Sequence, residues 1–216
     1  IVEAPVLGSN AEVILANAWQ FNQILARGVH GIILCHAETP DAVRTFVEVC
    51  RYAHKTVGVG YGLGVGRRGQ GGQGPAAMIW GTSPDGYIEK ADVWPLDPNG
   101  ELMLGLKIEN KRALSNVELT TRVPGIAFAE MGPGDMSLSV GYSRTPDGPY
   151  PTELQEARDR VFTSCKVAGI KFLESYTPEN AAQKIDEGVR ITGAAGERGD
   201  EVAVVGRAHV KRTMPV

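Results

Sequence analysis

Short apolar runs alternate with amphipathic segments along most of the chain, a pattern typical of strands joined by helices. The apolar runs predict strands at residues 1–4, 31–35, 56–60, 102–108, 126–130, 170–173 and 189–192. Capping signals and apolar spacing predict helices at residues 9–27, 39–52, 151–168, 177–188 and 200–211, with shorter helices after Ser83 and Ser115. Regular alternation of this kind indicates parallel strands with crossover helices.

The alternation predicts an α/β fold, arranged as a single (β/α)8 barrel domain over residues 1–216. Six of the predicted strands are clear and the run at 56–60 is weak, whereas such a barrel needs eight strands. The chain also opens inside a strand and does not start with methionine. Because an open barrel would expose strand edges, we expect that the first one or two β/α units are absent from this chain, or that a partner covers the edges.

Composition narrows the class of protein without identifying it. The chain has 43% hydrophobic residues, a formal net charge of −3 and an isoelectric point near 5.9. It has no long basic run and no apolar stretch that could cross a bilayer, so we expect neither a nucleic-acid partner nor a membrane. The three cysteines lie far apart and the first residues do not resemble a signal peptide, which favours a cytoplasmic protein with reduced thiols.

Residues 58–74 read GVGYGLGVGRRGQGGQG and are the most glycine-rich part of the chain. The spacing Gly-x-Gly-x-x-Gly occurs at residues 64–69, but no convincing helix follows and no P-loop lysine is present. A phosphate-binding role is therefore only an open alternative. We expect residues 58–79 to form a loop at the mouth of the site, where such loops often gate a reaction.

Charged side chains stand at the carboxyl ends of several predicted strands, where α/β folds bind ligands. Lys107 lies near the end of the strand at 102–108, and Glu109 directly follows this strand. The two share one face, because side chains alternate along a strand. Glu130 ends the strand at 126–130 and is a candidate for substrate binding. A desolvated Lys107 could form a Schiff base with a keto acid, although the neighbouring Glu109 argues against it by keeping the amine protonated.

Two further candidates follow the strand at 31–35. His36 and Glu38 are expected on one face of the strand, with Cys35 on the other. His36 could act as a general base near neutral pH, or it could be a hydrogen-bonded histidine at the rim. Glu38 is a candidate for substrate binding.

The stretch Gly132-Pro133-Gly134-Asp135 places a carboxylate after a turn with exposed backbone amides. Carboxylates crowded at one edge of a sheet repel each other unless a cation lies between them, so a divalent metal at Glu109 and Asp135 is the simplest arrangement. The amides of the turn would bind the carboxylate of a substrate. Each acid alone could have a plainer role, Asp135 as a helix N-cap and Glu109 as a surface acid, but the combination favours a site.

The segments KIENKRALSNVE at 107–118 and VPGIAFAEMGPGDMSLSVGY at 123–142 resemble the HpcH/HpaI aldolases, the class II pyruvate aldolases. The resemblance implies a (β/α)8 barrel and a homo-hexamer that exchanges its last helix, here residues 197–216, between subunits. It also implies cleavage of 4-hydroxy-2-oxo acids through a metal-bound pyruvate enolate. The cofactor would be Mg²⁺, Mn²⁺ or Co²⁺.

The same resemblance implies roles for individual residues. Glu109 and Asp135 would bind the metal ion. The backbone at Gly132, Pro133 and Gly134 would hold the pyruvyl carboxylate. The binding partners would then be a 2-oxo acid and an aldehyde.

The chain departs from the family pattern in several places. The first two strands of the family, which carry a His-Asp base pair, have no counterpart here. Glu3 stands where the family usually has a substrate-binding arginine, Lys107 replaces a glutamine, and Gly134 replaces an alanine. The first two replacements suggest a hypothesis, in which Lys107 restores the positive charge lost near the substrate.

We therefore expect a divalent-metal-dependent aldolase that cleaves or forms 4-hydroxy-2-oxo acids. Two alternatives remain open from the sequence. One is an acyl-CoA lyase of the citrate or malyl-CoA lyase type, and the other is a catalytically impaired barrel that still binds metal. Metal dependence and activity with acyl-CoA would separate them.

Overall fold

The structure, a computed structural model, describes residues 1–193 and 197–212. The chain divides into two compact units, Ile1–Ile170 and Lys171–Val216, and each is described by itself. The single domain predicted over residues 1–216 stays a prediction.

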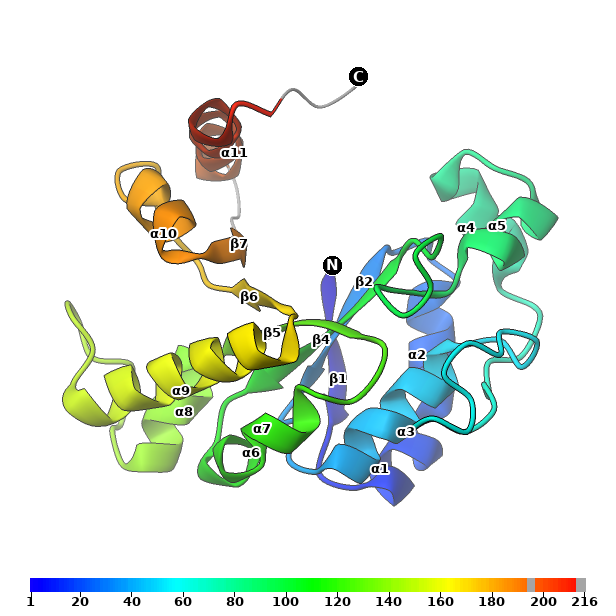
Figure 1. The fold of residues 1–216 in the computed structure, drawn as a ribbon, viewed down its shortest axis with the longest axis horizontal. Helices are drawn as coiled ribbons and strands as arrows, with labels where there is room; N and C mark the ends of the chain where they lie inside the picture. Colours follow the sequence, from blue (N-terminus) through cyan, green and yellow to red (C-terminus); the bar gives the residue numbers. More distant parts are fainter. Residues whose placement is uncertain (194–196, 213–216) are drawn as a thin grey trace. The chain divides into compact units, whose positions relative to one another are not determined.

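The first unit is built on a parallel sheet with the strand order β1-β2-β4-β5, and the short β3 pairs with β4 (Figure 1). The strands are β1 (Val2–Leu7), β2 (Gly31–Cys35), β3 (Val93–Trp94), β4 (Leu102–Ile108) and β5 (Ile126–Met131). β4 lies inside the sheet, and its Leu104, Leu106 and Ile108 are fully buried. Because all these pairings are parallel, the carboxyl ends of β2, β4 and β5 meet at one edge of the sheet.

Helices connect these strands and cover the sheet. They are α1 (Ala11–Ala16), α2 (Ala18–Leu25), α3 (Pro40–Cys50), α4 (Gln73–Trp80), α5 (Pro84–Lys90), α6 (Lys111–Ser115), α7 (Val117–Thr120), α8 (Pro133–Val140) and α9 (Thr152–Ala168). α2 packs against β1 and α9 packs against β5. Figure 1 shows α1 to α3 on one side of the strands and α8 and α9 on the other.

Helix starts follow capping chemistry. Thr39 and Ser83 accept hydrogen bonds from the first turns of α3 and α5, as their sequences predicted. The first helix begins at Ala11, two residues after the predicted start at residue 9, because Asn10 supplies the capping side chain. It also breaks at Asn17 into α1 and α2, where the sequence predicted one continuous helix.

The second unit contains β6 (Lys171–Leu173), α10 (Ala181–Glu187), β7 (Val189–Ile191) and α11 (Glu197–Val210). β6 and β7 pair in parallel, and α10 packs against α11 and β7. These elements match the predicted order of strand, helix, strand and helix. The last four residues of the segment proposed for exchange between subunits lie outside the described residues, and the exchange itself stays a prediction.

The strand predicted at residues 56–60 is wrong. Gly58 and Gly60 have φ angles of 82° and 81°, a left-handed conformation that interrupts a strand. The sequence prediction also missed β3, which is too short to show a period, and α4, whose first turn contains Gly74 and Pro75.

Residues 58–79, the glycine-rich segment and its continuation, lie near the amino-terminal ends of the strands. Gly62 adjoins the ring of Pro124, which stands just before β5. The amide of Gly64 donates to the carboxylate of Glu48 in the last turn of α3, the helix that leads back from the carboxyl end of β2. The prediction that this segment forms the mouth of the site is therefore wrong within this chain, because its contacts lie at the other edge of the sheet.

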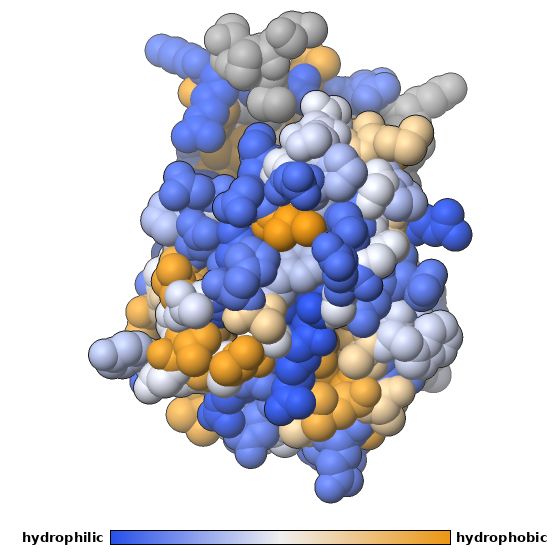
Figure 2. All heavy atoms as spheres, turned by 90° about the vertical axis from the view of Figure 1, so that its right-hand side faces the viewer, coloured by the Kyte–Doolittle hydropathy of each residue, from blue (hydrophilic) through white to orange (hydrophobic). Residues whose placement is uncertain are grey.

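The predicted α/β class with parallel strands and connecting helices is confirmed. Among the described residues, no helix is both long enough and apolar enough to pass through a membrane. On the face shown in Figure 2, apolar side chains form several separate groups among polar ones.

Candidate active site

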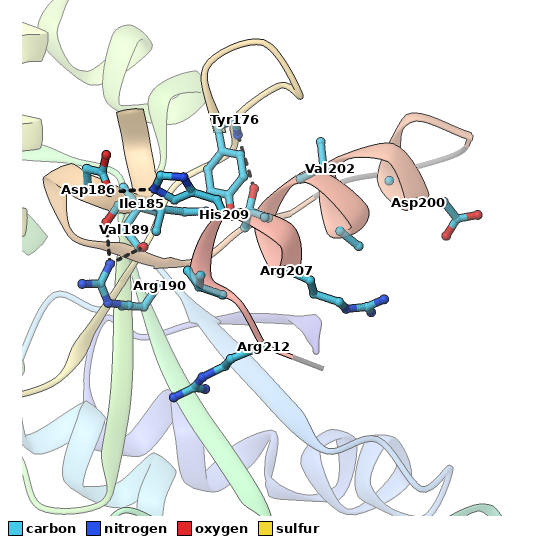
Figure 3. Close-up of a pocket in the computed structure, with 15 residues that line it drawn as sticks. Tyr176, Ile185, Asp186, Val189, Arg190, Asp200, Val202, Arg207, His209 and Arg212 are labelled. Atoms are coloured by element: carbon cyan, nitrogen blue, oxygen red, sulfur yellow. Dashed lines mark hydrogen bonds and ion pairs between the residues drawn. The ribbon is translucent and has the colours of Figure 1, made fainter. Parts of the chain in front are cut away.

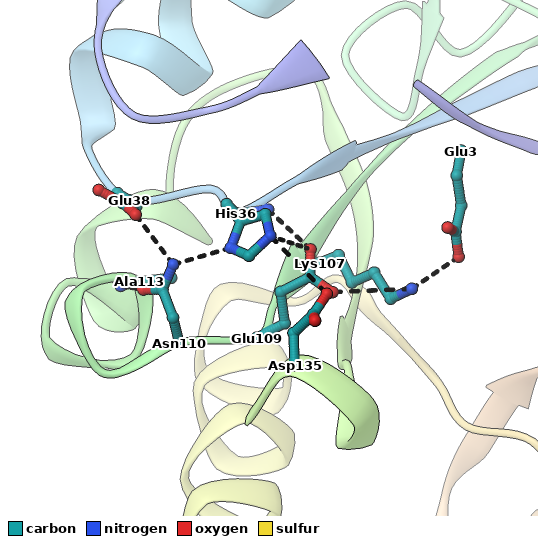
Figure 4. Close-up of polar contacts among 8 residues, drawn as sticks. All are labelled: Glu3, His36, Glu38, Lys107, Glu109, Asn110, Ala113 and Asp135. Carbon is teal, nitrogen blue, oxygen red and sulfur yellow. Dashed lines mark hydrogen bonds and ion pairs between the residues drawn. The ribbon is translucent and has the colours of Figure 1, made fainter. Parts of the chain in front are cut away.

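Three side chains from different strand ends converge in the first unit (Figure 4). His36 follows β2, Glu109 follows β4 and Asp135 lies in the first turn of α8, directly after β5. One possible ligand atom from each lies within 4.8 Å of the others. The Nε2 atom of His36 is 3.6 Å from Oε1 of Glu109 and 3.7 Å from Oδ2 of Asp135. The sequence prediction that Glu109 and Asp135 lie together is therefore consistent with the geometry.

Glu109 is the buried member of the cluster, with 2% of its surface exposed. Burial raises the pKa of its carboxyl group, while the hydrogen bond from the backbone N–H of His36 and the charge of Lys107 lower it, and the net direction is upward. A buried carboxylate is costly unless a positive charge is close. A cation bound between Glu109 and Asp135 would remove this cost.

Gly132 makes room for the Glu109 carboxylate. A Cβ atom at position 132 would lie 2.8 Å from both Cβ and Oε2 of Glu109 and 2.9 Å from Cε of Lys107. Its φ of −74° is open to any residue, so the glycine is needed here for space rather than for backbone conformation. The turn and the acid thus fit together as one structure.

The turn also presents amide groups at the start of α8, but fewer than the sequence suggested. The Gly132 N–H already donates to the carbonyl of Ile108, and Pro133 has no N–H. No side chain caps this helix, so the first-turn amides of Gly134 and Asp135 remain as donors for an anion. Of the three residues predicted to hold a carboxylate, only Gly134 therefore offers a free amide, and carboxylate binding at this turn stays a prediction.

Lys107 forms an ion pair with Glu3, with 2.7 Å between Nζ and Oε1, and its Nζ lies 3.7 Å from Oε2 of Glu109. Burial lowers the pKa of Lys107, but the hydrogen bond to Glu3 and the charges of Glu109 and Glu130 outweigh it, so the pKa lies above its usual value. The amine therefore stays protonated at neutral pH. This state opposes the Schiff-base alternative, because the nucleophile would be the neutral amine.

His36 has a positive φ of 47°, so the extended strand ends before it. This turn directs the backbone N–H of His36 to Oε1 of Glu109, at 3.0 Å. The turn also ends the alternation of side chains between the two faces of the strand, and Cys35 lines the same cavity as His36. The prediction that Cys35 points away from the site is wrong for this reason.

Glu38 does not line that cavity, and both of its carboxylate oxygens have partners. Oε1 accepts from Nδ2 of Asn110 at 2.8 Å, and Oε2 accepts from Nε of Arg112 at 3.0 Å. Both oxygens are thus engaged within the chain, and the assignment of Glu38 to substrate binding stays a prediction. Asn110, which the sequence prediction missed, links Glu38 to His36, and its place directly after the Lys-Ile-Glu strand end is the signal that could have found it.

Glu130 is paired in register with Lys107 on the neighbouring strand. Burial, together with the charges of Glu3 and Glu109, raises its pKa to about 7 despite the lowering effect of Lys107. In the described part of the chain it has no hydrogen bond or ion pair with the cluster. Its role in substrate binding stays a prediction.

The cluster borders an open cavity of about 340 Å³, large enough for a small organic acid. Its lining comes from β1 and from the strand ends: Glu3, Ala4, Pro5, Val6, Leu7, Cys35, His36, Lys107, Glu109 and Asp135. A larger cavity of about 960 Å³ lies within the second unit, bordered by residues of α10, β7 and α11 (Figure 3). Among the described residues, a group of three potential metal ligands occurs only beside the smaller cavity, which is therefore the candidate active site.

The donor set fits a hard divalent cation. Two carboxylates from Glu109 and Asp135 are oxygen ligands of the kind that Mg²⁺ and Mn²⁺ prefer, and Asp135 is half exposed, which leaves access for water and substrate. The absence of a side chain at Gly132 supports the fit, because any Cβ atom there would displace the Glu109 carboxylate.

Comparison with known proteins relates this sequence to a family. The sequence model of the HpcH/HpaI aldolase/citrate lyase family matches residues 11–203. The chain is 29% identical over 161 residues to a 2-keto-3-deoxy-L-rhamnonate aldolase of Salmonella paratyphi B, a match that covers 74% of this chain and 48% of that protein. It is 27% identical over 150 residues to a 4-hydroxy-2-oxo-heptane-1,7-dioate aldolase of Shigella sonnei, covering 69% of this chain and 49% of that protein. The chain thus spans about half the length of these relatives.

A solved structure shows the same fold. It is an HpcH/HpaI aldolase/citrate lyase family protein from Burkholderia cenocepacia, with a TM-score of 0.67 and 20% identity. The match covers 97% of this chain and 72% of that one. The expected fold class is confirmed by this likeness.

Proposed function

The chain belongs to the HpcH/HpaI aldolase/citrate lyase family, and from this premise we propose that it is a divalent-metal-dependent aldolase of 4-hydroxy-2-oxo acids. Pyruvate would be the donor in synthesis and a product of cleavage. The names of the relatives support an aldolase, and the convergence of Glu109 and Asp135 beside a small cavity supports a metal-dependent one.

In this proposal the carboxylates of Glu109 and Asp135 hold Mg²⁺, Mn²⁺ or Co²⁺. When bound, such an ion supplies a Lewis acid that stabilises negative charge on the oxygen of a 2-oxo group, an effect worth several kcal/mol. Glu109 is held by the His36 amide and by the space at Gly132, so its carboxylate is oriented before the ion arrives. Asp135 lies in the first turn of α8 and is half exposed, so its carboxylate would be accessible to an ion that enters from solvent.

The remaining polar groups of the cavity would bind the carboxylate of the substrate. The free amides of Gly134 and Asp135 lie at a helix start, where the backbone favours an anion. Lys107 adds a positive charge on the neighbouring strand β4, in agreement with the hypothesis that it compensates for Glu3. Lys107→Gln is then expected to raise KM for the 2-oxo acid more than it lowers kcat, and an unchanged KM would reject this role.

One observation carries the proposal: the Glu109 carboxylate fits against Gly132 and lies within 4.8 Å of the Asp135 carboxylate, at the ends of two neighbouring strands. A surface pair of acids would not need the glycine. A metal site that uses the buried Glu109 carboxylate does need the glycine, because this carboxylate lies against the turn.

The test is release of pyruvate from 4-hydroxy-2-oxo acids, measured with chelator and then with each of the three ions added back. We expect metal-dependent release in the wild-type chain. Glu109→Gln and Asp135→Asn should each lower kcat/KM by a factor on the order of 100 or more, since several kcal/mol of charge stabilisation is removed. Glu101→Gln is the control, because Glu101 is a surface acid directly before β4, at the amino-terminal end of the strand whose carboxyl end leads to Glu109.

Other results would assign the chain a different reaction or no activity. Release that persists in chelator, with an adduct trapped by borohydride, would contradict the metal-dependent reaction. Cleavage of a 3-hydroxyacyl-CoA without cleavage of the free oxo acids would indicate the lyase branch of the family. Metal binding without any activity would indicate an impaired barrel.

A further inference from the structure

The Asn110 side chain has a fixed orientation. Its Oδ1 accepts the backbone N–H of Ala113 at 2.8 Å, which makes Asn110 the N-cap of α6. Its Nδ2 lies 2.8 Å from Oε1 of Glu38, an acceptor. Exchanging oxygen and nitrogen would place two acceptors together at Glu38 and two donors together at Ala113, so this network permits one orientation of the amide.

This orientation determines the role of one nitrogen of His36. Nδ2 of Asn110 has two hydrogens, and its second neighbour is Nδ1 of His36, at 2.9 Å. An amide nitrogen can only donate, so Nδ1 must accept. A neutral imidazole that accepts at Nδ1 carries its proton on Nε2, the nitrogen that faces Glu109 and Asp135.

The Nε2–H group therefore points into the space between the two carboxylates. Its distances of 3.6 Å to Glu109 and 3.7 Å to Asp135 exceed the range of about 3.2 Å for a hydrogen bond, so the donor is not satisfied by either acid. A small oxygen acceptor that binds beside a cation held by the two acids would satisfy it. Figure 4 shows the three side chains directed toward this common space.

We propose that His36 is a hydrogen-bond donor to an oxygen atom of the 2-oxo acid, and that Asn110 is a positioning residue that keeps the proton on Nε2. The inference rests on the proposed function for the identity of the substrate, but not for the tautomer. It differs from two other roles that the cluster suggests. A general base or a metal ligand would need a free lone pair on Nε2, and Asn110 opposes that state because it offers no acceptor for a proton on Nδ1.

The first test reads the tautomer directly, by long-range ¹H–¹⁵N correlation spectra of histidine-labelled protein. The chain has four histidines, and the His36 signals are those missing from His36→Gln. We expect Nε2 to be protonated and Nδ1 to be unprotonated, with and without Mg²⁺. Addition of pyruvate with Mg²⁺ should shift the Nε2–H proton downfield, as a hydrogen bond forms. A proton on Nδ1, or an Nε2–H signal that pyruvate does not move, would overturn the proposal.

The second test moves the proton. Asn110→Asp combined with Glu38→Gln keeps a capping oxygen for Ala113, but places an acceptor beside Nδ1 of His36. We expect the proton to move to Nδ1 in this double variant. Asn116→Asp is the matched control, because Asn116 also contacts Glu38 but not His36, and its spectrum should keep the wild-type tautomer. An Nε2–H tautomer in the double variant would show that Asn110 does not position the ring.

The third test separates a donor from a metal ligand by calorimetric titration with Co²⁺. If His36 is a donor, His36→Gln should change the dissociation constant by less than about threefold, whereas loss of a ligand should weaken binding at least about tenfold, as even partners outside the ligand shell do. Weakening equal to that of Glu109→Gln would make His36 a ligand and overturn the proposal.

The tests distinguish this inference from the proposed function. A wild-type chain that releases no pyruvate, but shows the Nε2–H tautomer and its response to pyruvate, would contradict the aldolase activity alone. Metal-dependent release with a proton on Nδ1 of His36 would contradict this inference alone.

Discussion

The carboxylate of Glu109 shows how much of the chemistry depends on single atoms. It is almost completely buried, it accepts the His36 amide, and it fits only because residue 132 has no side chain. The alternation of side chains along β4 predicted that Lys107 and Glu109 share a face, and their contact confirms it. The place of Asn110 directly after a strand end marks it as a candidate, but its pairing with His36 could not be predicted, because period-2 patterns carry no information about neighbouring elements.

Gly132→Ala tests the packing of the turn against the acid. The new Cβ would approach Glu109 and Lys107 closer than 3 Å, so something must shift. We expect a loss of about 1–3 kcal/mol in the free energy of unfolding, and weaker metal binding. Gly134→Ala is the matched control, since its Cβ would meet nothing within 4 Å and alanine favours a helix. Equal stability of the two variants in urea titrations would contradict the packing argument.

Glu130→Gln tests the buried carboxyl group beside Lys107. The pKa of Glu130 is raised to about 7 from a usual value of 4.5, so its ionisation costs free energy in the folded state. Glu130 therefore destabilises the folded state least below about pH 4.5, and it destabilises that state more as the pH rises to about 7. The variant should be more stable than wild type by about 3 kcal/mol at pH 8, but by less than about 1 kcal/mol at pH 5. Urea titrations at both values measure this, and a constant difference would contradict the raised pKa.

At the scale of elements, the strands with long apolar runs were predictable and the short or glycine-containing elements were not. β4 and α9 were predicted almost to the residue, α9 because Gly169 ends it in a left-handed conformation. β3 and α4 were missed, since β3 has only two residues and α4 begins inside a glycine-rich segment. Their positions depend on tertiary contacts instead.

One such contact is the ion pair between Arg51 at the end of α3 and Asp92 before β3. Both side chains are almost fully buried, and two hydrogen bonds of 2.6 Å and 2.8 Å join them. Asp92→Asn should cost about 3–5 kcal/mol in the free energy of unfolding, because it leaves a buried guanidinium without its counter-charge. Asp41→Asn, which breaks the exposed pair with Arg44, should cost less than about 1 kcal/mol in the same urea titration. Similar costs for the two variants would contradict this account.

At the scale of the whole molecule, the alternation of strands and helices and the family could be predicted from the sequence, and the match over residues 11–203 confirms the family. The position of the glycine-rich segment could not, because its contacts with Glu48 and Pro124 join parts of the chain that are far apart. The oligomer implied by the family resemblance remains a proposal.

The exposed edge strand β1 predicts that copies of this chain associate with one another. In the described residues β1 has one strand neighbour, β2, and its Val2 and Leu7 are exposed. Because exposed strand edges favour pairing with other chains, the 216-residue chain should associate with increasing concentration in sedimentation velocity experiments. Val2→Lys should reduce this association, whereas Glu12→Lys on α1 should not. A monomer at every concentration would contradict the prediction.

The central claim is that Glu109 and Asp135 hold a divalent cation, and calorimetric titration with Mn²⁺ tests it most directly. The wild-type chain should bind one ion, Glu109→Gln should weaken binding at least about tenfold, and Glu130→Gln should bind as wild type does. Glu130 is a fair control because it is also a largely buried acid, on the strand beside Lys107, but lies outside the cluster. Equal affinity in all three proteins, or no binding by the wild type, would contradict the account.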